Sequence, residues 1–368
     1  MKKTKLFTIL TVFAMATIIT ACEKEQGGNK TIIKESDKSI TIIENTDDET
    51  NTPNVTVDKI NKLENIEILD WLDKDRAIVS KENETLDKLT LEELSDSYPR
   101  SLYIYDINTK EYKLLKEKKN VFLGGAELSP DKKHLFYIEY TLGDPIYYVL
   151  NMETLESFPI SGEKNPGIMS ASFADNDTII GTSFGGVYMI NTKGEVTMLE
   201  EFNDESLYFI KKVEDNIFYS STYENEALTR YNLTTKEKVS LGLTSVYNII
   251  LSDNTDQLLV LQNNGVKATI TLCDFDGKNA KVIAEGSDLG GVSWSPDNRF
   301  IAFNVMDEGN NASVSSLSVY DILTNEVTQI VVDIPYLNTN WNPEGNMLVF
   351  VDSDGIRYNS SMVSLLVE

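Results

Sequence analysis

Tyr103-Ile-Tyr-Asp-Ile-Asn-Thr-Lys110 is the first of six copies of a short unit, in which a β-prone run ends in Asp or Asn and a turn follows. The Asp or Asn positions are Asp106, Asn151, Asn191, Asn232, Asp274 and Asp321, so successive copies lie 45, 40, 41, 42 and 47 residues apart. A repeat of about 40–45 residues built from β-hairpins is typical of a propeller blade, which must stack on neighbouring blades to bury its faces. The repeat therefore predicts an all-β propeller.

A hairpin turn precedes each unit, and the number of these turns gives the expected number of blades. It is clearest at Trp294-Ser-Pro-Asp297 and Trp341-Asn-Pro-Glu344, where Pro presets φ at the second turn position. Seven such turns occur, and the last blade is one strand short. The β-prone segment Val55–Leu63 precedes the first blade and is expected to supply this outer strand, because propellers close their seam to avoid bare edges. We expect seven blades of four-stranded antiparallel sheets over residues 57–368, closed by an N-terminal strand. Six or eight blades are the alternatives.

The turn sequences also resemble a known family. Trp-Ser-Pro-Asp-Asn-Arg-Phe-Ile-Ala-Phe at 294–303 is similar to the repeat of TolB-like, WD-repeat-like propellers, a type also found in the prolyl oligopeptidase family. The resemblance extends to residues 128–138 and 341–351 and is weaker in the middle blades. It implies the propeller architecture and little about activity, because such propellers serve as scaffolds, binding platforms and enzyme accessories.

The N-terminal residues 1–22 have the anatomy of a signal peptide. A cationic start, Met1-Lys-Lys-Thr-Lys5, precedes an apolar stretch that is shorter than the ~20 residues of a spanning helix. Small residues before Cys22 resemble a bacterial lipobox, which predicts a lipid on Cys22 and a protein anchored to the bacterial cell membrane, facing out of the cytoplasm. The alternative is an ordinary secretory signal. The acidic, Gly- and Asn-rich residues 23–56 are expected to form a flexible linker, within which Ser39–Ile43 is prone to pair as an edge strand.

The charge of the chain limits its partners. It carries 33 basic and 58 acidic residues, a net charge of −25. This excess of negative charge disfavours nucleic acid and anionic membrane surfaces. It is typical of a solvated surface, and the functional alternative is attraction of cations or of a basic partner. The two cysteines are Cys22 and Cys273, so lipidation of Cys22 leaves no intramolecular disulfide.

Motifs that suggest catalysis lack their required context. Gly181-Thr-Ser-Phe-Gly185 matches the nucleophile elbow of serine hydrolases, but a strand and not a helix is predicted after it. The single histidine, His134, is expected to begin a blade strand, and one His is a poor basis for a zinc site. Asp274–Gly277 and Asp352–Gly355 are more typical of tight turns than of calcium loops, although carboxylates of several blades are an alternative source of calcium ligands in the channel. We predict no catalytic residue, no metal and no cofactor.

Three functions are compatible with this sequence. The leading prediction is a monomeric, non-enzymatic binding or scaffold module for a protein, peptide or envelope component. The alternatives are a metal-dependent lactonase- or lyase-like propeller enzyme and a non-catalytic accessory domain of a peptidase. Repeat proteins often carry insertions on their binding face, and the longest insertion, Lys81–Arg100, is predicted to include a short amphipathic helix. The candidate recognition face contains Tyr98, Arg100, Tyr140 and Tyr336, because Tyr and Arg often dominate binding energy at interfaces.

Overall fold

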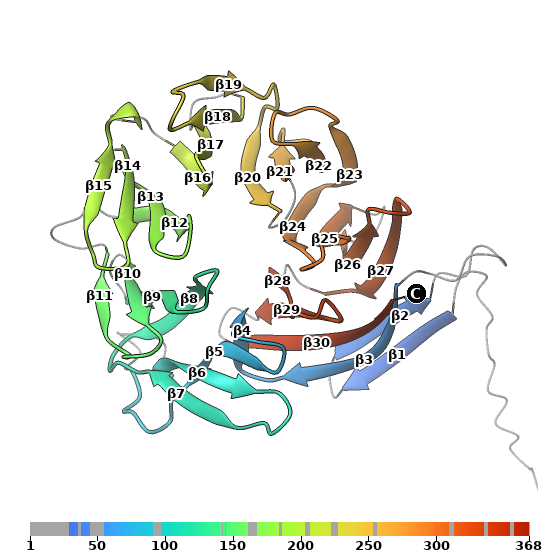
Figure 1. Ribbon diagram of the computed structural model, residues 1–368. Helices are drawn as coiled ribbons and strands as arrows, with labels where there is room; N and C mark the ends of the chain where they lie inside the picture. Colours follow the sequence, from blue (N-terminus) through green and yellow to red (C-terminus); the bar gives the residue numbers. More distant parts are fainter. Residues whose placement is uncertain are drawn as a thin grey trace, which may run out of the picture.

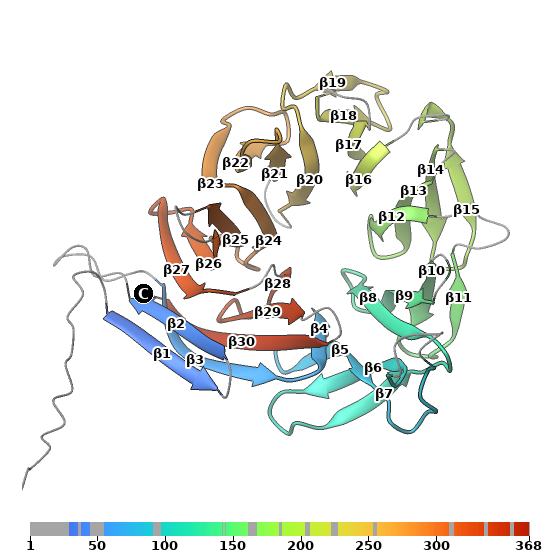
Figure 2. The same cartoon turned by 180° about the vertical axis from the view of Figure 1, so that it is seen from behind.

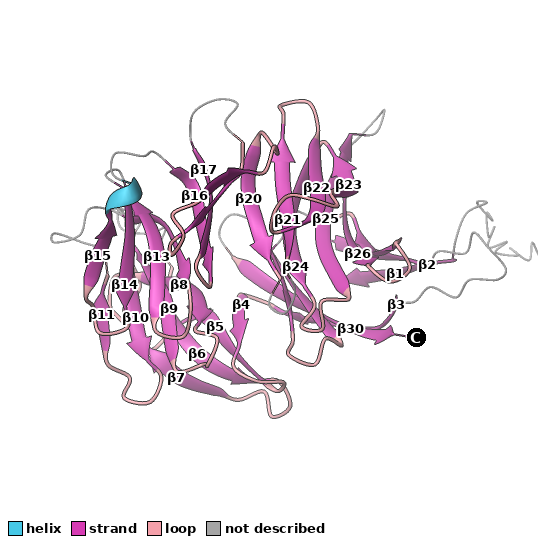
Figure 3. Ribbon diagram, turned by 45° about the horizontal axis from the view of Figure 1, so that its top comes forward, coloured by secondary structure: helices cyan, strands magenta, loops and turns pink. Residues whose placement is uncertain are grey.

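The computed structural model describes residues 29–35, 38–44, 55–90, 97–141, 143, 145–160, 168–183, 186–202, 207–221, 227–252, 256–308, 313–334, 338–353 and 357–367. Within these residues the regular structure consists of 30 strands and one 3-10 helix of three residues, Glu200–Phe202. Figure 3 shows how completely strands dominate the fold. This composition confirms the predicted all-β class.

Seven antiparallel sheets surround a central channel, and in each sheet the first strand lies closest to the channel (Figure 1). The first four sheets contain β4 (Ile66–Trp71), β5 (Arg76–Glu82), β6 (Arg100–Asp106) and β7 (Tyr112–Lys116); β8 (Phe122–Leu128), β9 (His134–Tyr140), β10 (Ile146–Asn151) and β11 (Ser157–Pro159); β12 (Ile168–Phe173), β13 (Thr178–Ser183), β14 (Gly186–Asn191) and β15 (Val196–Leu199); and β16 (Leu207–Val213), β17 (Asn216–Ser221), β18 (Thr229–Asn232) and β19 (Lys238–Ser240).

The remaining three sheets contain β20 (Val246–Leu251), β21 (Gln257–Asn263), β22 (Ala268–Asp274) and β23 (Lys281–Gly286); β24 (Asp288–Trp294), β25 (Phe300–Glu308), β26 (Ser313–Asp321) and β27 (Glu326–Val332); and β28 (Asn338–Trp341), β29 (Met347–Ser353), β30 (Tyr358–Val367) and β3 (Val55–Leu63). We number these sheets as blades 1 to 7. Seven blades are confirmed, and the six- and eight-bladed alternatives are wrong.

The N-terminal strand β3 closes the ring, as the sequence predicted. It pairs antiparallel with β30, from Val55 opposite Val367 to Leu63 opposite Ser360. Val55 is buried in one apolar cluster with Val363, Leu365 and other residues of blades 6 and 7. The first strand of the propeller therefore completes its last blade, which leaves no unpaired seam between the two ends of the ring.

A hairpin N-terminal to β3 extends blade 6. Its strands, β1 (Asn29–Glu35) and β2 (Lys38–Glu44), pair with each other, and Thr41 of β2 is the partner of Val332 in β27. Blade 6 thereby becomes a six-stranded sheet, and Figures 1 and 2 show the hairpin on the outer side of the ring. Both strands lie within residues 23–56, and β2 includes the segment Ser39–Ile43.

The repeated Asp or Asn closes the turn between the third and fourth strands of a blade. In blade 2 the Oδ1 atom of Asn151 accepts hydrogen bonds from the backbone nitrogens of Glu153 and Thr154, both at 2.9 Å. Asp106 and Asn232 make the same pair of bonds in their own blades. Asp and Asn share this acceptor oxygen, which explains why either residue serves at this position.

The Ser-Pro-Asp turns close the hairpins between first and second strands. The Ser129 hydroxyl donates to Asp131 Oδ1 at 2.9 Å and accepts from the His134 backbone nitrogen at 3.0 Å. Blade 6 repeats this arrangement at Ser295 and Asp297. These turns and the Asp/Asn turns share one end of the ring, the turn face. The loops between second and third strands and the links between blades lie at the other end, the connection face.

The three tryptophans pack between blades. Trp71, Trp294 and Trp341 are the last residues of the inner strands β4, β24 and β28. Trp341 stacks on Phe300 of the preceding blade with ring centroids 6.3 Å apart, and Trp71 is almost fully buried. These side chains therefore belong to the inter-blade core.

The amphipathic helix predicted within Lys81–Arg100 is wrong for the residues described there, 81–90 and 97–100. The segment forms turns and extended chain, tied by a hydrogen bond from the Leu89 nitrogen to the Ser97 carbonyl at 2.8 Å. Leu89 is fully buried. Burial of one leucine and backbone pairing across the loop replace the apolar face that a helix would have presented.

Candidate functional site

The inner strands carry the bends that shape the channel. In six blades the pairing of the first two strands shifts register, at Ile68/Asp70, Gly124/Glu127, Ile168/Ser170, Leu207/Phe209, Val246/Asn248 and Gly290/Ser293. A bulge bends its strand and re-aims the side chains beside it. These irregularities lie in the strands closest to the channel.

Two of these bulges contain Gly-Gly pairs, Gly124-Gly125 and Gly290-Gly291, at matching positions of two similar segments, 123–131 and 289–297. Gly125 and Gly291 both have φ of +55°, a left-handed conformation that glycine adopts readily. A Cβ atom on Gly125 would lie 2.7 Å from Ile138 Cδ1 and 2.9 Å from the Tyr140 hydroxyl. The missing side chain therefore lets Tyr140 pack directly over the inner strand of blade 2.

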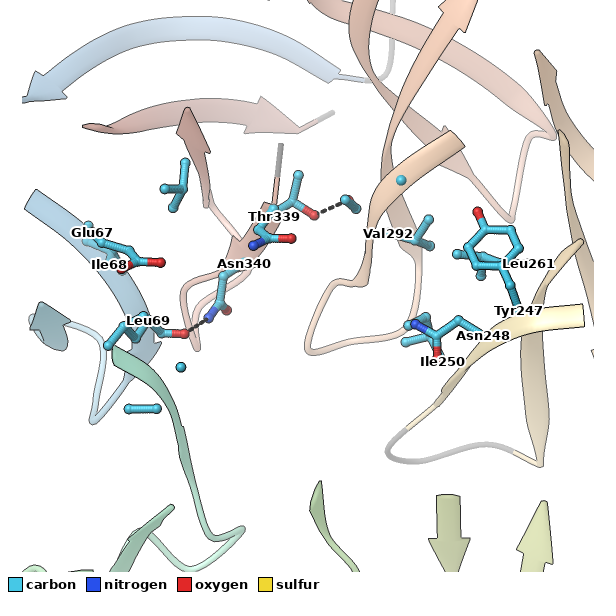
Figure 4. Close-up of a pocket in the computed structure, with 16 residues that line it drawn as sticks. Glu67, Ile68, Leu69, Tyr247, Asn248, Ile250, Leu261, Val292, Thr339 and Asn340 are labelled. Carbon is cyan, nitrogen blue, oxygen red and sulfur yellow. Dashed lines mark hydrogen bonds between the residues drawn. The ribbon is translucent and has the colours of Figure 1, made fainter. Parts of the chain in front are cut away.

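A cavity of about 400 Å³ occupies the channel between blades 1, 2, 5, 6 and 7 (Figure 4). Glu67 of β4 points into it from one wall, and Asn248 of β20 lies on the opposite wall. Thr339 and Asn340 of β28 line the wall beside Glu67. The cavity lining therefore combines the carboxyl group of Glu67 with the amide groups of Asn248 and Asn340 and the hydroxyl group of Thr339.

Some polar side chains of the cavity lining form hydrogen bonds between blades. Asn340 Nδ2 donates to the Leu69 carbonyl at 3.1 Å, and the Thr339 hydroxyl donates to the Gly291 carbonyl (Figure 4). Asn248 Oδ1 accepts a bond from the Ile249 nitrogen at 2.9 Å. Among the described residues, Asn340 Oδ1 and Asn248 Nδ2 have no hydrogen-bond partner. Each wall therefore keeps hydrogen-bonding capacity for a ligand.

Glu67 is the single ionisable carboxyl group in the lining of this cavity. Burial raises the pKa of Glu67, and the charge of Arg100 acts in the opposite direction. No residue in the described part of the chain donates a hydrogen bond to its carboxylate. Within the described part of the chain, the partly buried carboxylate of Glu67 therefore keeps its acceptor sites available for a ligand.

Arg100, a predicted recognition residue, lies at the connection face but is buried there. Its side chain is 5% exposed. Its guanidinium donates to Ser80 Oγ at 3.0 Å, to the Ser80 carbonyl at 2.6 Å and to Asn65 Oδ1 at 3.0 Å. The Tyr358 ring centroid lies 5.4 Å from the guanidinium carbon. Arg100 thereby ties blade 1 together below an exposed aromatic ring.

The other predicted recognition residues differ in their exposure. Tyr140 is 40% exposed at the end of β9, and Tyr98 is half-buried with the Lys88 ammonium 5.1 Å from its ring centroid. Burial of the phenol, with a further contribution from Glu67, raises the pKa of Tyr140 to about 12. Tyr336 lies outside the described residues. Tyr98, Arg100 and Tyr140 all lie at the connection face, and their role in recognition stays a prediction.

The sequence analysis missed Glu67 and Tyr358. Tyr358, 40% exposed, is the first residue of β30. It follows the connection between the second and third strands of blade 7, which corresponds to the connection in blade 1 that contains Tyr98 and leads into the strand of Arg100. Its position after that connection was therefore a usable signal. Glu67 carried none, because an acidic residue early in a strand is ordinary unless its neighbours in space are known. Glu67, Arg100, Tyr140 and Tyr358 form the group that we call the rim cluster.

The residues that resemble catalytic motifs lie in the strands and turns that the sequence predicted. Gly186–Asn191 is the strand β14, so no helix follows Ser183 as a nucleophile elbow requires. His134 begins β9 at the turn face. The Gly277 nitrogen donates to the Asp274 carbonyl at 2.9 Å, as in a tight turn. Within the described ranges no three His, Cys, Asp or Glu residues are grouped so that they could hold a metal ion, and no helix is long and apolar enough to cross a membrane.

Comparison with known proteins finds similarity at the level of structure. No family model matches the sequence, and no curated protein matches it. Oligogalacturonate lyase from Vibrio parahaemolyticus is similar with a TM-score of 0.61 and 12% identity, covering 92% of this chain and 97% of that chain. The β-propeller domain of Cps50 (Swd1) from Myceliophteria thermophila has a TM-score of 0.53 and 10% identity, covering 83% and 99%.

A prolyl endopeptidase is also similar, with a TM-score of 0.56 and 13% identity, covering 83% of this chain and 50% of that chain. This similarity and the seven sheets agree with the β-propeller architecture that the sequence resemblance implied. The resemblance is thereby confirmed for the fold. Identities this low show the fold alone, because one fold serves many functions.

Proposed function

We propose that this protein is a non-catalytic binding propeller that recognises a protein, peptide or envelope component at its connection face. The channel cavity and two exposed tyrosines at the same end of the ring support this most directly. Tyr140 and Tyr358 are each 40% exposed at the connection face, and Glu67, near the start of β4 at that face, lines the cavity. Exposed aromatic residues next to a concave site with unsatisfied polar groups are typical of binding surfaces.

Crosslinking in cells tests this proposal. A photoreactive amino acid at Tyr140 or Tyr358 should capture a partner, whereas the same amino acid at Lys133, an exposed residue of the turn face, should not. The double variant Tyr140→Ala/Tyr358→Ala should reduce capture at least tenfold while still unfolding cooperatively above the temperature of the experiment. Capture from Lys133 alone would place the binding surface at the turn face and would contradict the proposal.

The absence of catalysis is part of the same proposal. Metal analysis of the purified full-length protein should find no stoichiometric divalent ion. One tightly bound divalent ion per chain would instead favour a metal-dependent lyase- or lactonase-like enzyme, because a metal in the channel supplies a Lewis acid.

We further propose that the protein is a monomer anchored by lipid on Cys22 to the bacterial cell membrane, outside the cytoplasm. Acyl chains hold a soluble domain at a membrane because each buried CH₂ contributes about 0.8 kcal/mol. The Cys22→Ala variant should leave the detergent-extracted membrane fraction, and its continued presence there would contradict the anchor.

A further inference from the structure

We propose that the rim cluster and the cavity accept one organic cation, the ammonium of a lysine or the guanidinium of an arginine, and that Glu67 holds it. This inference rests on the proposed function, since the cation would be presented by the partner that binds the connection face. It assigns that partner a basic side chain at the centre of its contact surface.

The position of Glu67 is the first reason. Its carboxyl group is the single charge in the cavity lining and points into the cavity (Figure 4). A Cβ atom on Gly124 would lie 3.8 Å from Glu67 Oε2 and 3.5 Å from Tyr140 Cε2, so the carboxylate and the ring both approach the same glycine. A cation held by Glu67 would therefore lie near the Tyr140 ring, and aromatic faces attract positive charge.

The state of Glu67 is the second reason. Arg100 directs three hydrogen bonds to Ser80 and Asn65, and none of its nitrogens lies within ion-pairing distance of the Glu67 carboxylate. The positive charge of Arg100 opposes a second cation, but no described residue donates a hydrogen bond to the Glu67 carboxylate. Desolvation without a hydrogen-bond donor is unfavourable for a carboxylate, and an N–H donor from a cation relieves it.

The remaining walls fit the rest of a peptide. Among the described residues, Asn340 Oδ1 is a second acceptor without a donor, and Asn248 Nδ2 on the opposite wall is a donor without an acceptor (Figure 4). A volume of about 400 Å³ lies near the lower end of the range for ligand sites, which suits one long side chain. The net charge of −25 favours approach of cations and opposes anions.

Three small probes test this inference on the full-length protein in detergent. N-acetyl-lysinamide and N-acetyl-argininamide carry the cation, and N-acetyl-norleucinamide is their uncharged counterpart. NMR titration should detect binding of the first two, at least tenfold tighter than that of the third. Equal binding of all three would overturn the inference, because the cavity would then select apolar bulk and not charge.

Two variants locate the interaction. Glu67→Gln keeps the shape of the side chain and should weaken binding of the cationic probes at least tenfold. Glu111→Gln removes the same charge from an exposed turn on the turn face and should leave binding unchanged. Equal loss in both variants would mean that the probes respond to overall charge, which would contradict a site at Glu67.

The wild-type protein supplies a test that needs no variant. Acetylation of the lysine side-chain amine removes its charge, so the doubly acetylated probe should bind as weakly as the norleucine probe. The partner itself separates this inference from the proposed function. If Glu67→Gln captures the partner as well as wild type while Tyr140→Ala/Tyr358→Ala does not, the cation site is wrong and the binding surface stands. If the double variant also captures it, the proposed surface is wrong.

Discussion

The backbone nitrogen of Leu128 donates a hydrogen bond of 2.7 Å to Asp70 Oδ2, which joins the inner strand of blade 2 to that of blade 1. The same relationship recurs one blade further on, where the Phe173 nitrogen donates to Glu127 Oε1 at 3.3 Å. Asp70 and Glu127 occupy the same position, next to the last residue of their inner strands. Polar side chains at this position therefore link blade 1 to blade 2 and blade 2 to blade 3, in addition to the apolar core between the blades.

Removal of the acceptor at Asp70 should destabilise the propeller. Hydrogen bonds to charged groups contribute about 1.5–3 kcal/mol, so we expect Asp70→Ala to lower the free energy of unfolding by that amount. Asp70→Asn keeps an acceptor oxygen and should lose less than half as much. Urea denaturation of both variants provides the measurement. Equal losses would mean that the carboxylate charge, and not the bond to Leu128, carries the effect.

An alanine at Gly125 should cost more than an alanine at another left-handed glycine. Gly265 has φ of +82° and open space around it, so Gly265→Ala should cost only the backbone strain of about 1 kcal/mol. Gly125→Ala adds overlap with Ile138 and Tyr140, and overpacking costs about 1–3 kcal/mol more. Thermal unfolding compares the two variants. Equal melting temperatures would mean that Tyr140 moves aside freely, which would contradict its packing over blade 2.

Loss of β3 should open the ring. A protein that starts at Asn65 lacks the strand that pairs with β30 and loses buried Val55 with its partly buried neighbours Val57 and Ile60. Each such side chain contributes up to about 2 kcal/mol, so we expect a melting temperature about 10 °C lower, or aggregation. A protein that starts at Asn51 keeps β3 and is the control. Identical melting of the two proteins would show that β3 does not hold the ring closed.

The thiol of Cys273 should be inert in the folded protein. The side chain is almost fully buried, and this burial, with Asp274 and Asp276 nearby, raises its pKa to about 11. Only the thiolate reacts, so alkylation should be slow at mildly alkaline pH and should become fast in denaturing urea. Iodoacetamide labelling of the Cys22→Ala variant, followed by mass spectrometry, measures both rates. Rapid labelling of the folded protein would show that blade 5 opens locally.

Much of the architecture was predictable because a blade is a local unit. The Asp or Asn at positions such as Asn151 bonds backbone nitrogens two and three residues ahead, so the turn is encoded within a few residues. The Ser129 and Asp131 turn is equally local. Val55 and Val367 are paired although they lie near opposite ends of the propeller sequence. This pairing was predictable because the last blade lacked one strand and a β-prone segment without a blade of its own preceded the first blade.

The candidate site was only partly predictable because its residues come from different blades. Insertion loops pointed to Tyr140 and Arg100 at the connection face. The sequence could not indicate that Arg100 is turned inward to Ser80 and Asn65, or that Tyr358 covers it. The amphipathic helix failed for the same reason, since burial of Leu89 depends on what lies beneath the loop.

The sequence by itself determined the repeat, the number of blades, the closing strand and the face that carries the longest loops, because each follows from turn chemistry and strand periodicity within one blade. The tertiary structure alone decided that Glu67 lines a cavity and approaches the same glycine as Tyr140, with no hydrogen-bond donor among the described residues. Bulges at the inner strands and bare glycines at Gly124 and Gly125 set that arrangement, and their effect on a neighbouring blade appears only when the blades are packed around one axis.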